Sequence, residues 1–81
     1  MFEKEPLEKD ALNRIRWDKS LNPEDFTVHY LDRFSSKLKE VKYVDILLDG
    51  DYIVVGGSQI PVHRIREIRR RGRVVWAKRR A

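Results

Sequence analysis

Cysteine is absent from the 81 residues, and so are long apolar runs. Without cysteine the chain has no disulfides, no thiolate zinc site and no thiol nucleophile, which fits a reducing compartment. No apolar segment approaches the ~20 residues of a membrane span, and the opening MFEKEPLEKD lacks the apolar centre of a signal peptide. We therefore expect a cytoplasmic protein without a membrane partner.

Signals for phosphate loops and metal sites are lacking as well. The pair Gly56-Gly57 has neither the lysine nor the following helix of a phosphate loop, and residues 49–51 (DGD) are explained by a turn. No set of His, Asp and Glu has the spacing of metal ligands. We expect neither a metal nor a cofactor.

Positive charge is distributed unevenly along the chain. Residues 1–61 contain nine Lys or Arg against twelve Asp or Glu, whereas residues 62–81 contain nine against one, Glu67. Eight of those last nine cations are arginine, whose planar fork of donors matches phosphate and stacks on nucleobases. An acidic polymer or a phosphate group is the expected partner, and a solvated basic tail is the plain alternative.

An N-terminal helix is predicted over EPLEKDALNRIRW. Leu7, Ala11 and Ile15 recur every four residues and form one apolar stripe, with Leu12 alongside. Pro6 suits the first helical turn. A loop with an Asn-Pro turn signal follows.

The middle of the chain reads as short strands. Residues 26–34 alternate as a strand does, and residues 35–40 read as a polar connection. Residues 41–62 fit two or three strands separated by glycine turns, although their first part also fits a helical turn.

The basic end of the chain suits a hairpin that turns at residues 71–72. Gly72 is able to take the positive φ that a tight turn demands. We expect an irregular turn around residues 63–64 before the hairpin begins, and Val74 and Trp76 on one face of its second strand.

These elements predict a single α+β domain over residues 1–81, with an ordered core over residues 7–80. The helix is expected to pack on a twisted, mostly antiparallel sheet of four to six short strands, which can curl towards a barrel. A chain of this length has room for one small core and one modest pocket.

The histidines are candidates for phosphate contact. His63 lies beside Arg64, and its imidazole suits a hydrogen bond to phosphate or a role as general base; the plain alternative is a structural histidine in a turn. Two histidines at one phosphodiester act as acid and base in ribonuclease-like chemistry. Nothing in the spacing of His29 and His63 indicates that they meet.

Trp17 and Trp76 each stand among cations, an arrangement that allows a base to stack while its phosphates are neutralised. For Trp76 the alternative is a core anchor at the end of an apolar strand. The sequence leaves both interpretations open.

The segments ALNRIRWD, YLDR, IPVHRI and GRVVWAKR follow one another in this order between Leu12 and Arg79. In this they resemble a family of small, mostly archaeal proteins of uncharacterised function, related to the RNA cyclic group end recognition domain. The resemblance implies binding of RNA ends that carry a 2′,3′-cyclic phosphate. The matched positions are Asn13, Arg14, Trp17, Tyr30, Asp32, Arg33, His63, Arg64, Trp76 and Arg79.

One departure separates the chain from the two-histidine phosphoesterases that act on cyclic phosphates. Those enzymes place a hydroxyl residue two positions after each histidine, whereas here Leu31 follows His29 and Ile65 follows His63. This departure argues against importing their mechanism. A metal-independent phosphoesterase that acts on cyclic phosphate ends, with His63 and His29 as acid and base, is the alternative to RNA binding. A third reading is an arginine-rich module that docks on an acidic protein of an RNA-processing complex.

The candidate binding residues carry cationic, hydrogen-bonding or aromatic side chains suited to RNA, and they are Arg14, Trp17, Tyr30, Arg33, His63, Arg64, Arg66, Arg71 and Arg79. Arginines are expected to neutralise phosphates, and His63 and Arg14 to donate hydrogen bonds to a terminal phosphate. Trp17 or Tyr30 is expected to offer a stacking surface. We predict no catalytic residue in this set.

Overall fold

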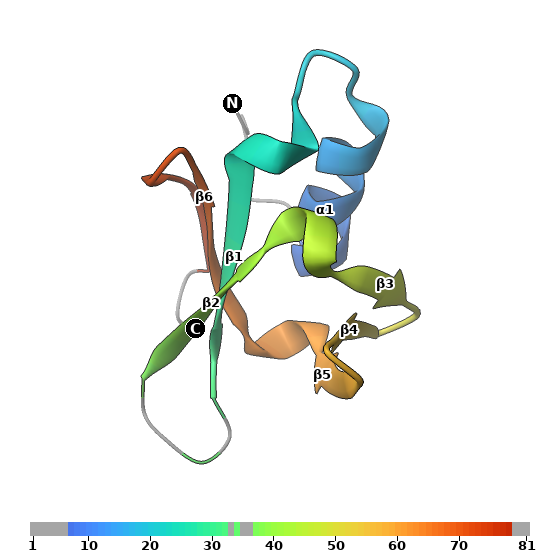
Figure 1. Cartoon of the computed structure of the whole chain (residues 1–81), viewed down its shortest axis with the longest axis vertical. Helices are drawn as coiled ribbons and strands as arrows, with labels where there is room; N and C mark the ends of the chain where they lie inside the picture. Colours follow the sequence, from blue (N-terminus) through green and yellow to red (C-terminus); the bar gives the residue numbers. More distant parts are fainter. Residues whose placement is uncertain (1–6, 33, 35–36, 79–81) are drawn as a thin grey trace.

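A computed structural model describes residues 7–32, 34 and 37–78 (Figure 1). The described part contains one α-helix, α1 (Glu8–Trp17), and three 3-10 turns, η1 (Pro23–Asp25), η2 (Tyr43–Asp45) and η3 (Val62–Arg64). Its strands are β1 (Phe26–Leu31), β2 (Leu38–Lys42), β3 (Leu47–Asp49), β4 (Tyr52–Val55), β5 (Ser58–Pro61), β6 (Ile65–Arg70) and β7 (Arg73–Ala77).

Helix α1 follows the predicted apolar stripe. The Leu7 carbonyl accepts a hydrogen bond from Ala11 N at 3.0 Å, and Ala11, Leu12 and Ile15 are buried. Acidic residues lie in the first turn and basic residues in the last, which complements the helix dipole. Leu7 itself is 71% exposed, because it occupies the N-cap ahead of the first turn and does not reach the core.

Four strands form one antiparallel sheet in the order β2-β1-β6-β7. Between β1 and β6 the register shifts: His29 lies opposite Glu67, and Tyr30 lies opposite Ile65. Arg66 is therefore the extra residue of a β-bulge. The bulge explains why Ile65 and Ile68, three positions apart, are both buried on the same side of one strand.

A second bulge lies between β6 and β7. Ile68 is opposite Trp76 and Arg69 is opposite Val74, which leaves Val75 as the extra residue. Trp76 is 4% exposed, whereas Val74 is 46% exposed. The prediction that Val74 and Trp76 share a face is wrong, because the bulge inverts the alternation between them.

The remaining strands form a small antiparallel sheet in the order β3-β4-β5. Its two turns contain Gly50 and the pair Gly56-Gly57, all with positive φ, as the turn signals predict. The helical turn at the start of residues 41–62 is present as η2. The prediction of a polar connection over residues 35–40 is wrong in its second half, where β2 begins. Because β2 is an edge strand that is exposed on most of its surface, its sequence shows no apolar alternation.

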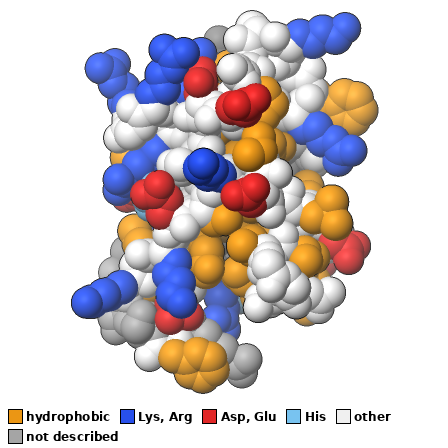
Figure 2. All heavy atoms as spheres, in the orientation of Figure 1, with side chains coloured by type: hydrophobic (Ala, Val, Ile, Leu, Met, Phe, Trp, Pro, Cys, Tyr) orange, Lys and Arg blue, Asp and Glu red, His pale blue; other side chains and the backbone are white. Residues whose placement is uncertain are grey.

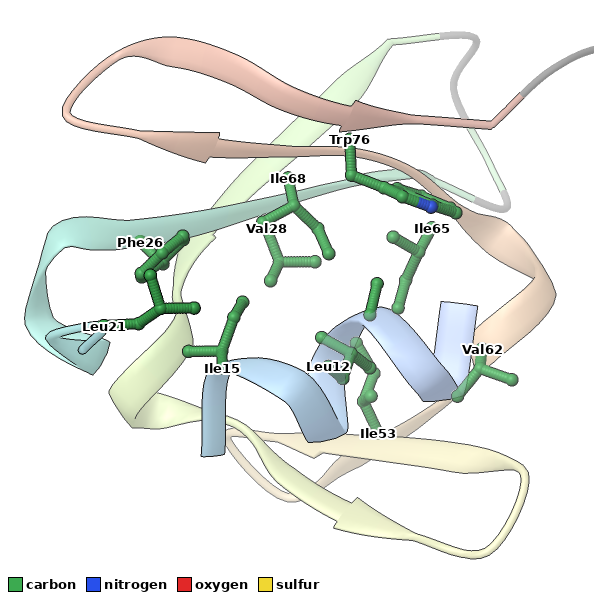
Figure 3. Packing of buried hydrophobic residues seen from close by; sticks show 11 residues of the cluster. Leu12, Ile15, Leu21, Phe26, Val28, Ile53, Val62, Ile65, Ile68 and Trp76 are labelled. Atoms are coloured by element: carbon green, nitrogen blue, oxygen red, sulfur yellow. The ribbon is translucent and has the colours of Figure 1, made fainter. Parts of the chain in front are cut away.

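Helix α1 lies between the two sheets, with the four-stranded sheet on one side and the small sheet on the other (Figure 3). The core is drawn from all three layers and consists of Ala11, Leu12, Ile15, Leu21, Phe26, Val28, Ile53, Val62, Ile65, Ile68 and Trp76. The predicted α+β class is confirmed. The strands are divided between two sheets instead of forming one, and over the described residues they close no barrel. No helix in the described part is long and apolar enough to cross a membrane.

Candidate nucleic-acid interface

A groove of about 630 Å³ opens between the two sheets, beside the end of β1 that is remote from the β6–β7 turn. Both sheets and η3 contribute to its walls. Its aromatic, charged and polar lining residues are Tyr30, Phe34, Tyr52, Asp32, Lys39, Arg64, Ser58 and Gln59. Figure 2 shows hydrophobic side chains exposed on one face, from the upper right to the lower centre, with charged side chains around them.

Three aromatic rings line this groove. Tyr30 packs partly against the core, whereas Tyr52 is 43% and Phe34 88% exposed. Rings held at a groove wall with one face accessible are suited to stacking on unpaired bases.

The groove also contains a small excess of positive charge. Arg64 closes η3 just before β6 begins, and no carboxylate of the described residues lies within ion-pair distance of its guanidinium. Lys39 Nζ lies 3.6 Å from Asp32 Oδ2, so these two charges largely offset each other. Among the described residues of the lining, Arg64 is thus the cation that no carboxylate neutralises.

His63 belongs to a neighbouring cluster outside the groove lining. Its side chain is exposed, and its carbonyl accepts hydrogen bonds from Arg66 Nη1 at 2.6 Å and Lys78 Nζ at 2.9 Å. Lys78 also pairs with Glu8 Oε2 at 2.8 Å. Burial alone raises the pKa of Glu8, but the hydrogen bond from Lys78 and the charges of Lys78 and His63 outweigh it, so the pKa is lowered from 4.5.

His29 lies elsewhere, on the face of the four-stranded sheet turned away from α1. It is 6% exposed, and its Nε2 lies 3.3 Å from Thr27 Oγ1 and 3.9 Å from Glu40 Oε1. No contact among the described residues joins His29 to His63. The arrangement brings no pair of imidazoles to one phosphodiester.

Arg14 and Trp17 lie at the C-terminal end of α1, away from the groove lining. Arg14 Nε lies 3.8 Å from Asp18 Oδ2, and Trp17 is 76% exposed. Beside them is a more apolar hollow of about 270 Å³ between the helix and β3. At that hollow, Tyr43 donates a hydrogen bond to the Leu12 carbonyl at 2.8 Å, and burial raises the pKa of Tyr43 from 10.0.

The other predicted residues are dispersed. Arg71 lies in the β6–β7 turn, at the opposite end of β6 from Arg64. Trp76 packs in the core, as its alternative interpretation held, and is therefore not available for stacking. Arg33 and Arg79 lie outside the described residues.

Residues 7–78 match the sequence model of a protein family, the MJ1316 RNA cyclic group end recognition domain. The chain belongs to this family. The resemblance found in the sequence is thereby confirmed, and the match covers every helix and strand described above.

Several archaeal proteins are similar to this chain. The chain is 32% identical over 74 residues to UPF0248 protein MMP0286 of Methanococcus maripaludis, a match that covers 88% of this chain and 97% of the relative. It is 39% identical over 72 residues to a UPF0248 protein of Metallosphaera sedula, covering 86% and 90%. UPF0248 protein MJ1316 of Methanocaldococcus jannaschii is 36% identical over 73 residues, covering 86% and 91%. No solved structure matches the chain.

Several groove residues of this MJ1316 family member were not predicted from the sequence. Lys39 comes from β2, Tyr52 from β4, and Ser58 and Gln59 from β5. Each reads locally as an ordinary strand or turn residue. The pairing of β2 with β1 places Lys39 opposite Tyr30, and the packing of one sheet beside the other brings in the residues of β4 and β5. The one signal in the sequence for these residues was the position of Tyr52, an aromatic residue just after the Asp-Gly turn.

Proposed function

We propose that this protein binds RNA and recognises phosphate-bearing ends, 2′,3′-cyclic phosphates in particular, in the groove between its two sheets. The observation that carries the proposal is the position of Arg64 in one groove with Tyr30 and Tyr52. Family membership supports it, since the domain is named for the recognition of RNA cyclic ends.

The groove offers complementary groups for each part of a terminal nucleotide. Tyr52 and Tyr30 provide ring faces for a base, and single-stranded RNA is recognised through such stacking. The Arg64 guanidinium presents parallel donors to two phosphate oxygens. Ser58 and Gln59 add hydrogen-bonding groups on the same wall.

The charge of the groove favours a cyclic end over an open one. Among the described lining residues, two cations, Arg64 and Lys39, are set against one carboxylate, Asp32, which leaves a net charge of one. A cyclic phosphate is a diester with a single negative charge, whereas an open terminal phosphate carries about −1.5 to −2 at neutral pH. The monoanionic ring balances this net charge, whereas an open phosphate brings a second negative charge that no remaining cation of the described lining offsets, so the ring is the better match.

The test compares three short RNAs that differ only at the 3′ end: cyclic phosphate, open phosphate and hydroxyl. We expect the cyclic end to bind most tightly and the preference to persist at near-physiological salt. Arg64→Ala removes charge-assisted hydrogen bonds worth about 1.5–3 kcal/mol, a loss of roughly 10- to 150-fold in affinity. Arg16→Ala, which removes an exposed arginine outside the groove, is the matched control and should bind as the wild type does.

Equal binding of all three ends, collapsing together as salt rises, would reduce the interaction to general electrostatics and refute the proposal. Wild-type affinity in Arg64→Ala would remove this groove from consideration as the binding site. Hydrolysis of the cyclic end would instead support the phosphoesterase alternative; we expect none, because neither imidazole lines the groove.

A further inference from the structure

Three arginines surround a second hollow at the opposite end of β6. This hollow, of about 410 Å³, is lined by Arg70, Arg71, Arg73 and Val75. These residues form the β6–β7 turn and the strand that follows it. The arginine hollow shares no lining residue with the groove that contains Arg64.

The Asp25 carboxylate lies close to two of these arginines. Asp25 Oδ1 lies 3.3 Å from Arg71 Nε, and Asp25 Oδ2 lies 4.0 Å from Arg70 Nε. The Asp25 carbonyl also accepts a hydrogen bond from the Arg71 backbone N–H at 2.8 Å. The Arg70 guanidinium is further positioned 5.8 Å above the Phe26 ring.

The arginine hollow keeps an excess of positive charge after this pairing. The Asp25 carboxylate is only 15% exposed and offsets one of the three cations. Arg73 has no carboxylate partner among residues 7–32, 34 and 37–78, and the Arg71 side chain is 77% exposed. An anion arriving from solvent therefore meets about two uncompensated charges.

The backbone at Arg71 is in an unfavourable conformation for arginine. Arg71 has φ of 51° and Gly72 has φ of 84°, so both central residues of this two-residue turn are left-handed. Turns of this kind favour Asn-Gly, because asparagine tolerates the left-handed region better than a long side chain does. A long cation at such a position points to function, since strained residues concentrate at binding sites.

We propose that Arg70, Arg71 and Arg73 bind backbone phosphates of the RNA whose 3′ end lies in the groove. This inference rests on the proposed function above. From Ile65 to Arg70, five steps of ~3.3 Å separate the two ends of β6 by roughly 16 Å. Stacked nucleotides rise ~3.4 Å each along a strand, so the arginine hollow meets phosphates about five nucleotides from the end.

Phosphate fits the arginine hollow better than an acidic protein does. Docking proteins rely on buried apolar or aromatic anchors with charges at the rim, and Val75 is the one apolar residue in this lining. Three guanidinium groups without such an anchor instead match the repeated oxygens of a phosphodiester backbone.

The test combines two RNA lengths with two classes of variant. RNAs of two and about ten nucleotides, both with a cyclic phosphate end, are titrated with wild type, Arg71→Asn, Arg73→Gln and the groove variant Arg64→Ala. Arg71→Asn suits the turn, so its melting temperature should be no lower than that of the wild type. Any loss of affinity in this variant then reflects the missing cation.

We expect wild type to bind the long RNA more tightly than the short one. The two hairpin variants, Arg71→Asn and Arg73→Gln, should lose this gain in affinity and bind the short RNA as the wild type does. For the long RNA, the slope of the logarithm of the binding constant against the logarithm of salt concentration should decrease in magnitude by about 0.7 for each phosphate contact removed. Arg64→Ala should weaken both lengths. Arg16→Ala should weaken neither.

Four results separate the two proposals. A short RNA that binds with no gain from length overturns the hairpin inference and leaves the groove intact. If both hairpin variants still bind the long RNA more tightly than the short one, the hairpin inference is overturned as well, and an acidic protein becomes the better partner for these arginines. Long RNA that needs the hairpin but shows no preference for its end supports phosphate binding by these arginines and refutes end recognition in the groove. Absence of RNA binding altogether refutes both.

Discussion

Replacing Tyr52 by alanine separates the contribution of stacking in the groove from that of charge. Tyr52 is 43% exposed and lies on the small sheet, so its ring is accessible while its backbone remains paired with Pro61 in β5. Stacking of one base on one ring is worth ~1–3 kcal/mol, and 1.4 kcal/mol corresponds to about tenfold in affinity. We therefore expect the dissociation constant of a short cyclic-phosphate RNA to rise about 5- to 150-fold.

Fluorescence anisotropy over a series of salt concentrations measures this change. Because Tyr52 is uncharged, Tyr52→Ala should weaken binding equally at every salt concentration, unlike Arg64→Ala. Tyr52→Phe keeps the ring and should bind as the wild type does. The reasoning is refuted if folded Tyr52→Ala retains full affinity, or if Tyr52→Phe is as weak as the alanine variant, since a hydroxyl contact would then be responsible.

Three further predictions concern stability. Trp76→Ala should cost about 3–5 kcal/mol in a urea titration, because it empties a core position; a cost below about 1 kcal/mol would contradict the burial of the ring. Tyr43→Phe loses the bond to the Leu12 carbonyl, worth ~1 kcal/mol, and should lower the melting temperature by about 4–8 °C, whereas an unchanged value would show that the bond contributes nothing. Since the pKa of Glu8 is lowered, its carboxylate stabilises the fold above 4.5 and ceases to do so as pH falls through the folded-state pKa; Glu8→Gln should therefore melt earlier than wild type at neutral pH but not in strong acid.

Elements set by local signals were predictable from the sequence. The apolar stripe of α1 and the glycine turns of the small sheet depend on residues within a few positions of one another. The turn at Arg71-Gly72 and the irregular η3 were found for the same reason. Strand β2 was not, because an exposed edge strand needs no apolar alternation and is defined by its partner β1.

The candidate site was predictable only in part. Tyr30 and Arg64 were both singled out, and the structure places them in one groove. The face of Trp76 relative to Val74 was missed, because a one-residue bulge between paired strands leaves no mark on the periodicity of either strand. Tyr52 was missed because no local pattern reveals which sheet packs beside which, and Lys39 because its strand β2 is defined by its pairing with β1.

The core joins both ends of the described chain. Ala11 and Leu12 of the first element pack in one cluster with Trp76 of the last, and Lys78 closes the arrangement by pairing with Glu8. During synthesis, the helix consequently has no complete surface to pack on until β7 has left the ribosome. The complete core can therefore assemble only once the last strand is present, so the folding of this domain depends on contacts between its two ends.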